Sequence, residues 1–351
     1  MKSNVFIKTW FFKSVMIFMA LFLGLLIYLP HAGAADKPIK LRYGSAYTES
    51  MWIGQAAVLW MKKVEKESGG KVKFDSYFGG TLITNKNAAG EVRGGTVDIA
   101  HIAMIFDPEF QLLQRIRAFI WGLGINDVKL ENQIYNDLIQ MYPLEKPIGD
   151  LKVMARTRNL PYQLITAKKP VRTLDDFKGL RLKCSPQYVS LLKSLGAEGI
   201  NLPTSELYVS LQKGTVDGTL FDYAAIKSFK LQEVAKYATN INLGSGVLPM
   251  EIMSRKSFDG LPKDIQQIID GSLGYWESEM YRLHLIDEEA GTQLGKDNGM
   301  TFFDLGSADM KQFHKLSYEA AREEARVLDN MGLPGSKVLE DMRRLNEKYS
   351  K

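Results

Sequence analysis

Gly95-Thr96-Val97-Asp98 is repeated later in the chain as Gly214-Thr215-Val216-Asp217. Each copy follows a segment of helix-forming residues, and glycine often ends a helix in the left-handed conformation that other residues avoid. A strand is expected to begin directly after each glycine turn. The repeat therefore predicts two α/β lobes of similar build.

Strand and helix patterns alternate on both sides of the repeat. Residues 40–44 and 71–75 have strand patterns, whereas apolar residues between 53 and 64 recur at helical spacing. The second copy lies in a similar series, with strand patterns at 164–166 and 180–183. Such alternation is typical of a mainly parallel sheet that is covered by helices on both faces.

A long helix is predicted to begin after Pro262. Its apolar stripe consists of Ile265, Ile268, Ile269, Leu273, Trp276, Met280 and Leu283. A stripe of this kind is far more often core, or a brace between lobes, than a cofactor-binding surface. Residues 310–349 are also expected to be helical, with a charged surface.

The size and charge of the chain limit the classes of protein to consider. Its 351 residues are too many for one small core and suit two α/β lobes. The formal net charge is +5, but lysine and arginine are scattered among aspartate and glutamate. No basic stripe marks a nucleic-acid surface, so nucleic acid is not an expected partner.

The N-terminal segment has the pattern of a secretory signal peptide. A basic opening at 2–13 precedes an apolar run at 15–28, and small residues at 31–35 fit a cleavage site. The apolar run is shorter than the roughly 20 residues that a membrane span needs. We predict a signal peptide at 1–34, export to the periplasm, and no stable membrane insertion after cleavage.

The chain lacks recognisable catalytic and metal-binding motifs. Its single cysteine, Cys184, cannot form an internal disulfide and is interpreted as a small buried hydrophobe rather than a catalytic thiol. His101, His284 and His314 are far apart and lack metal-ligand spacing. The adjacent carboxylates Glu288-Glu289 would point apart on a helix, so we expect them to be solvated. The sequence predicts no enzyme, no cofactor and no metal site.

Five stretches along the mature chain carry a resemblance to a known family. They are residues 39–43, 67–72, 95–98, 170–180 and 205–218. In this order, behind a signal peptide, the chain resembles the DctP-type solute-binding proteins of tripartite ATP-independent periplasmic (TRAP) transporters.

The resemblance implies an α/β, two-lobed periplasmic binding protein fold, type II-like, with crossing strands and a long bracing helix. Lobe I would hold residues 35–159 plus 248–287, and lobe II residues 160–247 plus 288–351. A small organic ligand would be captured by lobe closure. The closed protein would then deliver the ligand to the small and large membrane subunits of the transporter.

Departures from the family pattern indicate an unusual cleft. Lys183 stands where most members place an arginine that grips the ligand carboxylate with two prongs. An earlier pocket arginine of some members corresponds to Tyr162, a pocket aromatic to Thr204, and a polar residue to Phe221. His101 opens a first-lobe stretch that often carries charged groups. These changes predict a less charged and more apolar cleft.

The ligand is therefore expected to have an aromatic or aliphatic body and at most one weak anionic group. Aromatic side chains would supply the cleft walls, although we expect about half of them to pack in the core instead. The predicted ligand-binding residues are Tyr47, Trp52, His101, Tyr162, Lys183, Thr204, Phe221 and Tyr223.

Two alternatives stay open at the level of the sequence. The same binding fold could serve a membrane receptor, as a ligand sensor, instead of a transporter. A periplasmic enzyme is the second alternative, in which Lys183 would be a buried lysine with a lowered pKa.

Overall fold

The computed structural model describes residues 37–103, 122–123, 125, 128–142, 149–156, 160–244 and 249–350. The description below concerns the compact unit Lys40–Lys351, together with the start of its first strand at Ile39. The predicted signal peptide at 1–34 lies outside the described residues. Among the residues described, no helix combines the length and apolar character that a membrane span requires.

One sheet, here called sheet A, has the strand order β2-β1-β3-β10-β4. Strand β3 pairs in parallel with β1, whereas β10 is antiparallel to both β3 and β4. Its strands are β1 (Ile39–Gly44), β2 (Val72–Tyr77), β3 (Ile99–Ala103), β4 (Leu151–Arg156) and β10 (Pro249–Ser254).

The other sheet, sheet B, has the strand order β11-β9-β5-β8-β6-β7. Strand β6 is parallel to β7 and β8, and β11 is parallel to β9, but β5 is antiparallel to β8 and β9. Its strands are β5 (Tyr162–Thr166), β6 (Arg181–Lys183), β7 (Glu198–Ile200), β8 (Gly218–Phe221), β9 (Tyr237–Leu243) and β11 (Thr301–Asp304).

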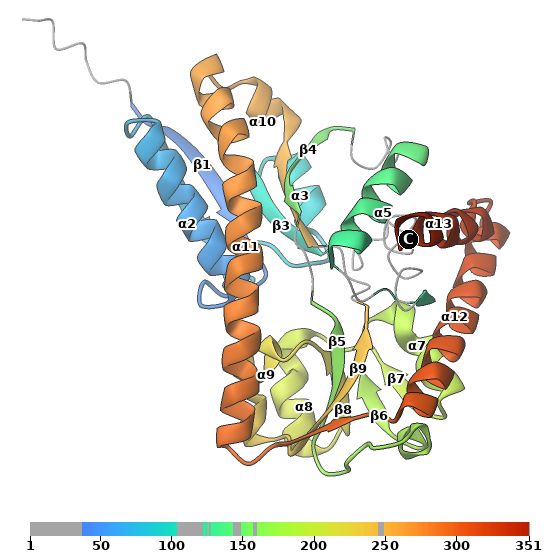
Figure 1. The fold of residues 1–351 in the computed structure, drawn as a ribbon. Helices are drawn as coiled ribbons and strands as arrows, with labels where there is room; N and C mark the ends of the chain where they lie inside the picture. The colour runs from blue at the N-terminus through green and yellow to red at the C-terminus, as the bar shows by residue number, and fades with distance from the viewer. Residues whose placement is uncertain are drawn as a thin grey trace, which may run out of the picture. The chain divides into compact units, whose positions relative to one another are not determined.

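Helices connect the strands and cover the sheets (Figure 1). The α-helices are α2 (Trp52–Glu67), α3 (Ala88–Gly94), α5 (Val128–Met141), α7 (Val189–Ser194), α8 (Leu207–Lys213), α9 (Ala224–Ser228), α10 (Arg255–Asp259), α11 (Lys263–Asp297), α12 (Ser307–Asn330) and α13 (Gly335–Tyr349). Short 3-10 turns are η3 (Leu174–Phe177), η4 (Pro186–Tyr188), η5 (Thr204–Glu206) and η6 (Leu231–Glu233).

The chain passes between the two sheets three times, the last time through α11, which lies between β10 of sheet A and β11 of sheet B. It passes from sheet A to sheet B between β4 and β5, and returns between β9 and β10. The predicted α/β fold with crossing strands is confirmed. The strand pairings that the structure describes are those of mainly parallel sheets, as expected, with one exception in each sheet: β5 and β10 enter from the other sheet and run against their neighbours. Their direction is not set by a strand–helix–strand crossover.

The glycine of each repeat copy ends a helix that leads into a strand, as predicted. Gly95 follows α3 with φ 76°, and Gly214 follows α8 with φ 70°, both in the left-handed region that favours glycine. Strand β3 then begins at Ile99 and strand β8 at Gly218, directly after the aspartate of each copy.

Each of these aspartates makes the same contacts with an arginine. Asp98 accepts hydrogen bonds from the backbone N–H of Arg42 at 2.8 Å and from its Nε at 3.3 Å. Asp217 accepts from the backbone N–H of Arg181 at 2.9 Å and from its Nε at 3.1 Å. Both arginines also donate to the carbonyl of the repeat glycine at 2.7 Å. The sequence repeat is therefore a structural repeat.

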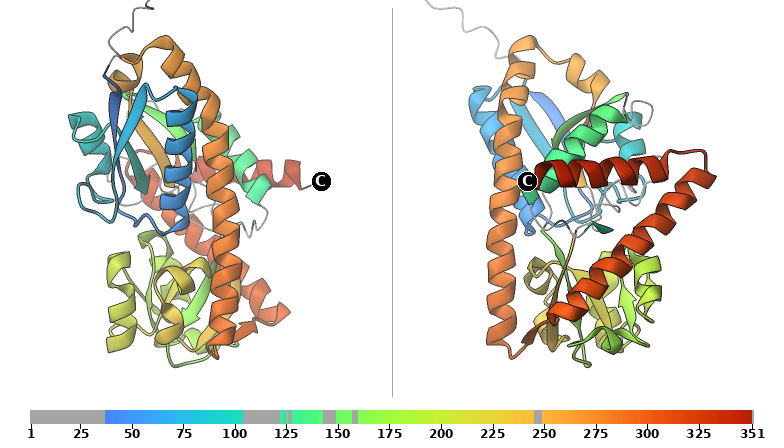
Figure 2. Two further views of the ribbon diagram at one scale, coloured as in Figure 1. Left: turned by 90° about the vertical axis from the view of Figure 1, so that its left-hand side faces the viewer. Right: turned by 45° about the vertical axis from the view of Figure 1, so that its right-hand side comes forward.

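Helix α11 confirms the predicted long brace. It is 35 residues long, begins after Pro262, and packs against α2 and α9 (Figures 1 and 2). Trp276 of α11 stacks on Trp60 of α2 with ring centroids 4.0 Å apart. The Trp60 indole N–H donates to the Ser272 hydroxyl at 2.8 Å, which satisfies a polar group that burial would otherwise leave unpaired.

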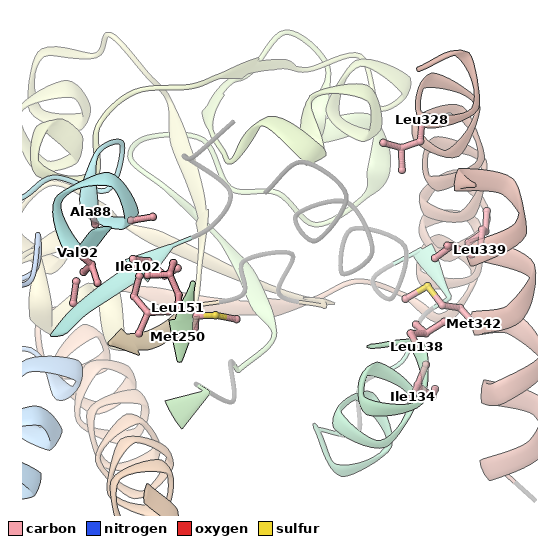
Figure 3. Packing of buried hydrophobic residues seen from close by; sticks show 14 of the residues in the cluster. Ala88, Val92, Ile102, Ile134, Leu138, Leu151, Met250, Leu328, Leu339 and Met342 are labelled. Carbon is pink, nitrogen blue, oxygen red and sulfur yellow. The ribbon is translucent and has the colours of Figure 1, made fainter. Parts of the chain in front are cut away.

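The C-terminal helices pack on the apolar core beside sheet A. Ile134 and Leu138 of α5 share one buried cluster with Leu339 and Met342 of α13 (Figure 3). Phe313, nearer the start of α12, belongs instead to a cluster of sheet B residues. Residues of the segment 288–351 thus join both cores, and the exact lobe bounds stay a prediction.

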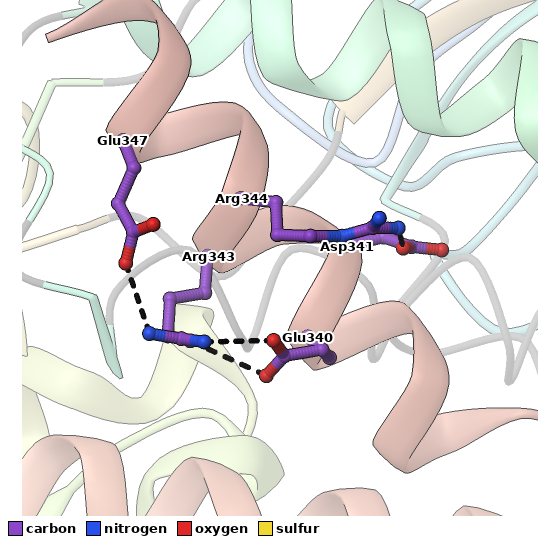
Figure 4. A network of polar contacts seen from close by, with 5 residues as sticks. All are labelled: Glu340, Asp341, Arg343, Arg344 and Glu347. Atoms are coloured by element: carbon purple, nitrogen blue, oxygen red, sulfur yellow. Dashed lines mark hydrogen bonds and ion pairs between the residues drawn. The ribbon is translucent and has the colours of Figure 1, made fainter.

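Helix α13 carries several ion pairs between its own residues. Arg343 bonds to Glu340 at 2.7 Å and to Glu347 at 2.9 Å, while Arg344 pairs with Asp341 (Figure 4). The two Arg343 contacts join residues three or four positions apart on the solvated side of the helix, whereas Asp341 is buried. Each Arg343 pair is expected to contribute about 0.5 kcal/mol or less to stability.

We predict that Asp217→Ala lowers the free energy of unfolding by about 1–3 kcal/mol, because it removes charge-assisted hydrogen bonds to Arg181. Urea denaturation measures the loss. The matched control is Asp175→Ala, since Asp175 pairs only with Lys178 at the exposed surface. Equal losses for the two variants would contradict this prediction.

The same aspartate gives a pH dependence of stability. The hydrogen bond from Arg181 lowers the pKa of Asp217. Its stabilisation is therefore complete above the unfolded-state pKa of about 3.9 and disappears as the pH falls through the lower folded-state pKa. We expect the difference in stability between the wild type and Asp217→Ala to shrink below about pH 4.

Candidate ligand-binding site

Lys183 and two aromatic rings lie together on adjacent strands of sheet B. Lys183 ends β6, Phe221 ends β8, and Tyr162 begins β5. The Lys183 Nζ lies 5.1 Å from the centroid of the Phe221 ring, and Phe221 stacks on Tyr162 with centroids 5.4 Å apart. Tyr188 of η4 contacts Tyr162 at 6.0 Å and donates its hydroxyl to the Gly244 carbonyl. The result is an ammonium group against an aromatic wall.

The ammonium of Lys183 is buried without a carboxylate partner. Its side chain is buried, and no ion pair joins its Nζ to any acidic residue that the structure describes. Burial lowers the pKa of Lys183 to about 8, because the charged form loses its hydration. A buried cation of this kind is stabilised by any anion that reaches it.

Cys184, the next residue, confirms the structural interpretation of the single cysteine. Its side chain is fully buried and forms no disulfide. Burial raises the pKa of the Cys184 thiol to about 12, so the thiol carries no charge at neutral pH. Burial therefore disfavours the thiolate, which is the nucleophilic form of cysteine.

A second group of residues surrounds His101 in sheet A. His101 lies directly opposite Glu251 in the register of β3 and β10, and its Nδ1 is 2.8 Å from the Glu251 Oε1. Both side chains are fully buried. The ring of Tyr47 meets the His101 ring edge-on, with centroids 5.3 Å apart. Burial first, and the Asp222 carboxylate in addition, raise the pKa of the Tyr47 hydroxyl.

Asp222 links this group to sheet B and to the brace helix. It directly follows Phe221, and its Oδ2 lies 3.1 Å from the Nε2 of His284 on α11. Trp52, the first residue of α2, stacks on His284 with centroids 4.1 Å apart and an interplanar angle of 9°. Elements from both sheets therefore converge on Asp222.

Six of the eight predicted site residues thus belong to connected contacts around Lys183, His101 and Asp222. Tyr223 points elsewhere: its ring meets Phe302 at 5.2 Å, and its hydroxyl donates to Asn240. Tyr223 is part of a buried core cluster of sheet B. Thr204 begins η5 and, among the contacts of the described residues, shares none with the other seven. Ligand binding by each of the eight stays a prediction.

Sequence reasoning missed the carboxylates that hold the two histidines. Glu251 is 150 residues from His101, and Asp222 is 62 residues from His284. A buried histidine commonly bonds to a carboxylate, but periodicity does not identify which one. The available signal was the position of Asp222 directly after Phe221, one of the predicted site residues.

The expectation that Glu288 is solvated is wrong. Its Oε2 accepts a hydrogen bond from the backbone N–H of Ala224, because α11 packs on the start of α9. Burial raises the pKa of Glu288 to about 8. Within the part of the chain that the structure describes, no group of three or more potential metal ligands occurs.

Two α/β sheets joined by crossing strands, with a long helix packed along both, define the class of two-lobed solute-binding proteins. Within it, the chain belongs to the DctP family, the bacterial extracellular solute-binding proteins of family 7, whose model matches residues 43–326. Proteins of this family serve TRAP transporters in the periplasm.

Relatives of known structure and function support this assignment. The C4-dicarboxylate-binding periplasmic protein DctP of Rhodobacter capsulatus is 25% identical over 83% of this chain and 85% of its own. A TRAP solute-binding protein of Rhodoferax ferrireducens, solved with copurified benzoate, has a TM-score of 0.76 at 22% identity, covering 89% of this chain and 98% of its own. A marine metagenome TRAP protein, solved with 3-hydroxybenzoate, has a TM-score of 0.79 at 21% identity, covering 90% and 100%.

The burial of Lys183 predicts a second pH effect on stability. Its folded-state pKa of about 8 lies below the unfolded value of about 10.4, so the folded ammonium is destabilising at neutral pH. We expect Lys183→Met to unfold at a higher temperature than the wild type at pH 7, with the gap closing between about pH 8 and 10. A gap that stays constant across this range, measured by thermal denaturation, would refute the prediction.

Proposed function

We propose that this protein captures a weakly anionic organic ligand with an aromatic or apolar body and delivers it to TRAP membrane subunits in the periplasm. The observation that carries the proposal is the buried ammonium of Lys183, which has no ion pair among the residues that the structure describes, against the stacked rings of Phe221 and Tyr162. A carboxylate at Lys183 would neutralise the buried charge while the rings cover the body of the ligand.

The single ammonium favours a monocarboxylate over a dicarboxylate. Lysine offers one compact charge and cannot grip a carboxylate with the two-pronged geometry of arginine. The remaining neighbours of Lys183 in this group, Phe221, Tyr162 and Tyr188, present aromatic surface. Related structures with benzoate and 3-hydroxybenzoate support the proposal, since they share this fold.

Capture would work by closure of the lobes around the ligand. The chain crosses between the sheets at β4–β5 and β9–β10, so these two connections are the proposed hinges. Lys183 and Phe221 belong to sheet B, whereas His101 belongs to sheet A. A ligand that contacts both sets would favour the closed state by the free energy of the added contacts.

We expect aromatic monocarboxylates, with benzoate as the first probe, to raise the melting temperature of the protein. At 100 times its Kd, a ligand stabilises the folded state by about 2.7 kcal/mol. Succinate and malate serve as short dicarboxylate comparisons, and mass spectrometry checks that the bound acid is recovered unchanged. Tight binding of the dicarboxylates with no response to aromatic acids would refute the proposed ligand class.

Lys183→Met is expected to weaken benzoate binding at least tenfold, because it removes a charge-assisted bond worth about 1.5–3 kcal/mol. In the wild type, affinity should fall as the pH rises through about 8, where Lys183 loses its proton. Lys178→Met is the matched control, since Lys178 is exposed and pairs with Asp175. Isothermal titration calorimetry at pH 7 and pH 9 measures both effects, and equal affinity of the two variants would argue against the assigned role.

A further inference from the structure

Among the buried hydrogen-bonding atoms that have no partner within the described structure, two lie near Tyr47. They are the Nε2 of His101 and the Oδ1 of Asp222. The His101 side chain is fully buried, and that of Asp222 is 5% exposed. A buried polar atom without a partner costs about 1–3 kcal/mol, so such atoms are rare and need an explanation.

The chemistry of the two residues defines what would satisfy them. The Nδ1 of His101 faces a carboxylate oxygen of Glu251, so Nδ1 carries the hydrogen and Nε2 of the neutral ring is an acceptor. The Oδ2 of Asp222 is occupied by His284, and its free Oδ1 can only accept. Both atoms therefore call for a hydrogen-bond donor.

These atoms lie close to the aromatic wall at Lys183. Tyr47 contacts the His101 ring at 5.3 Å and interacts electrostatically with Asp222, so it lies near both. Asp222 follows Phe221, and the Cα atoms of consecutive residues are about 3.8 Å apart. The Phe221 ring lies under the Lys183 ammonium, so Asp222 is the next residue along the chain from the aromatic wall.

We propose that the ligand is a hydroxylated organic acid, whose carboxylate pairs with Lys183 and whose hydroxyl donates to Asp222 or His101. A hydroxyl suits this position because it can donate a hydrogen bond to either acceptor. The inference rests on the proposed function and adds a second, polar recognition point to the apolar site.

The test compares acids that differ only in the hydroxyl. Calorimetry at pH 7 gives the Kd of the wild-type protein for benzoate and for 2-, 3- and 4-hydroxybenzoate. At least one hydroxybenzoate is expected to bind tenfold or more tightly than benzoate. If all four bind with equal affinity, an ordered water satisfies the two acceptors and the inference is overturned, while the proposed function stands. If none of the four binds, the proposed ligand class fails and the inference fails with it.

Two variants test whether Asp222 causes the preference for a hydroxybenzoate over benzoate. Asp222→Asn replaces the acceptor by an amide of the same shape and is expected to reduce the ratio of the two Kd values to about threefold or less. Asp287→Asn is the control: Asp287 is also a buried carboxylate and pairs with Lys227 at 2.6 Å. It should keep the full ratio. Because the readout is a ratio, a general loss of affinity does not imitate the result.

A further variant tests the inference independently, in case Asp222→Asn does not fold. Replacing both members of the other pair, as His101→Phe with Glu251→Leu, leaves no buried charge without a partner. This double variant should also lower the ratio for the preferred hydroxybenzoate. Retention of the full wild-type ratio by both Asp222→Asn and the double variant would overturn the inference.

Discussion

In each sheet, a hydrogen bond from the backbone N–H of an arginine to a repeat aspartate ties two neighbouring parallel strands together. Asp98 ties the start of β3 to Arg42 in β1, and Asp217 ties the start of β8 to Arg181 in β6. In both sheets the tied strands are parallel neighbours, whose pairing requires a long crossover and cannot be fixed by a tight turn. Strand β3 carries His101 in its middle, and strand β8 ends at Phe221. The positions of these two candidate site residues therefore depend on contacts made at the start of their strands.

The brace helix α11 is both a structural element and a part of the candidate site. One stretch of it stacks Trp276 on Trp60 in the apolar interface with α2, and another places His284 between Trp52 and Asp222. The helix contacts elements of both sheets. His284 itself contacts Trp52 of α2 and Asp222, the residue after β8. A ligand that bonds to Asp222 would act on a residue that the brace already holds.

The sequence was sufficient to predict the elements whose signal is local. The glycine of each repeat copy, the strands next to it, and the helix after Pro262 all follow from periodicity and capping preferences. The direction of β5 and β10 did not follow, because each joins a sheet built from a distant part of the chain. The hydrogen-bond partners of His101 and His284 could not be predicted for the same reason, since they are distant in the sequence. Tyr223 shows the limit for aromatic residues, since nothing in its local sequence separates a core ring from a cleft ring.

Cys184 is the only cysteine of the chain, and its thiol is buried and uncharged at neutral pH. We therefore expect the native protein to react slowly with thiol-directed reagents such as maleimides, which react with the thiolate form. A single cysteine introduced on the surface of either sheet's outer helices would be the one reactive handle on the molecule. Fluorescent or spin labels can thus be attached at a chosen point without first removing a native residue, which opens the motion around the strand crossings to direct spectroscopic observation.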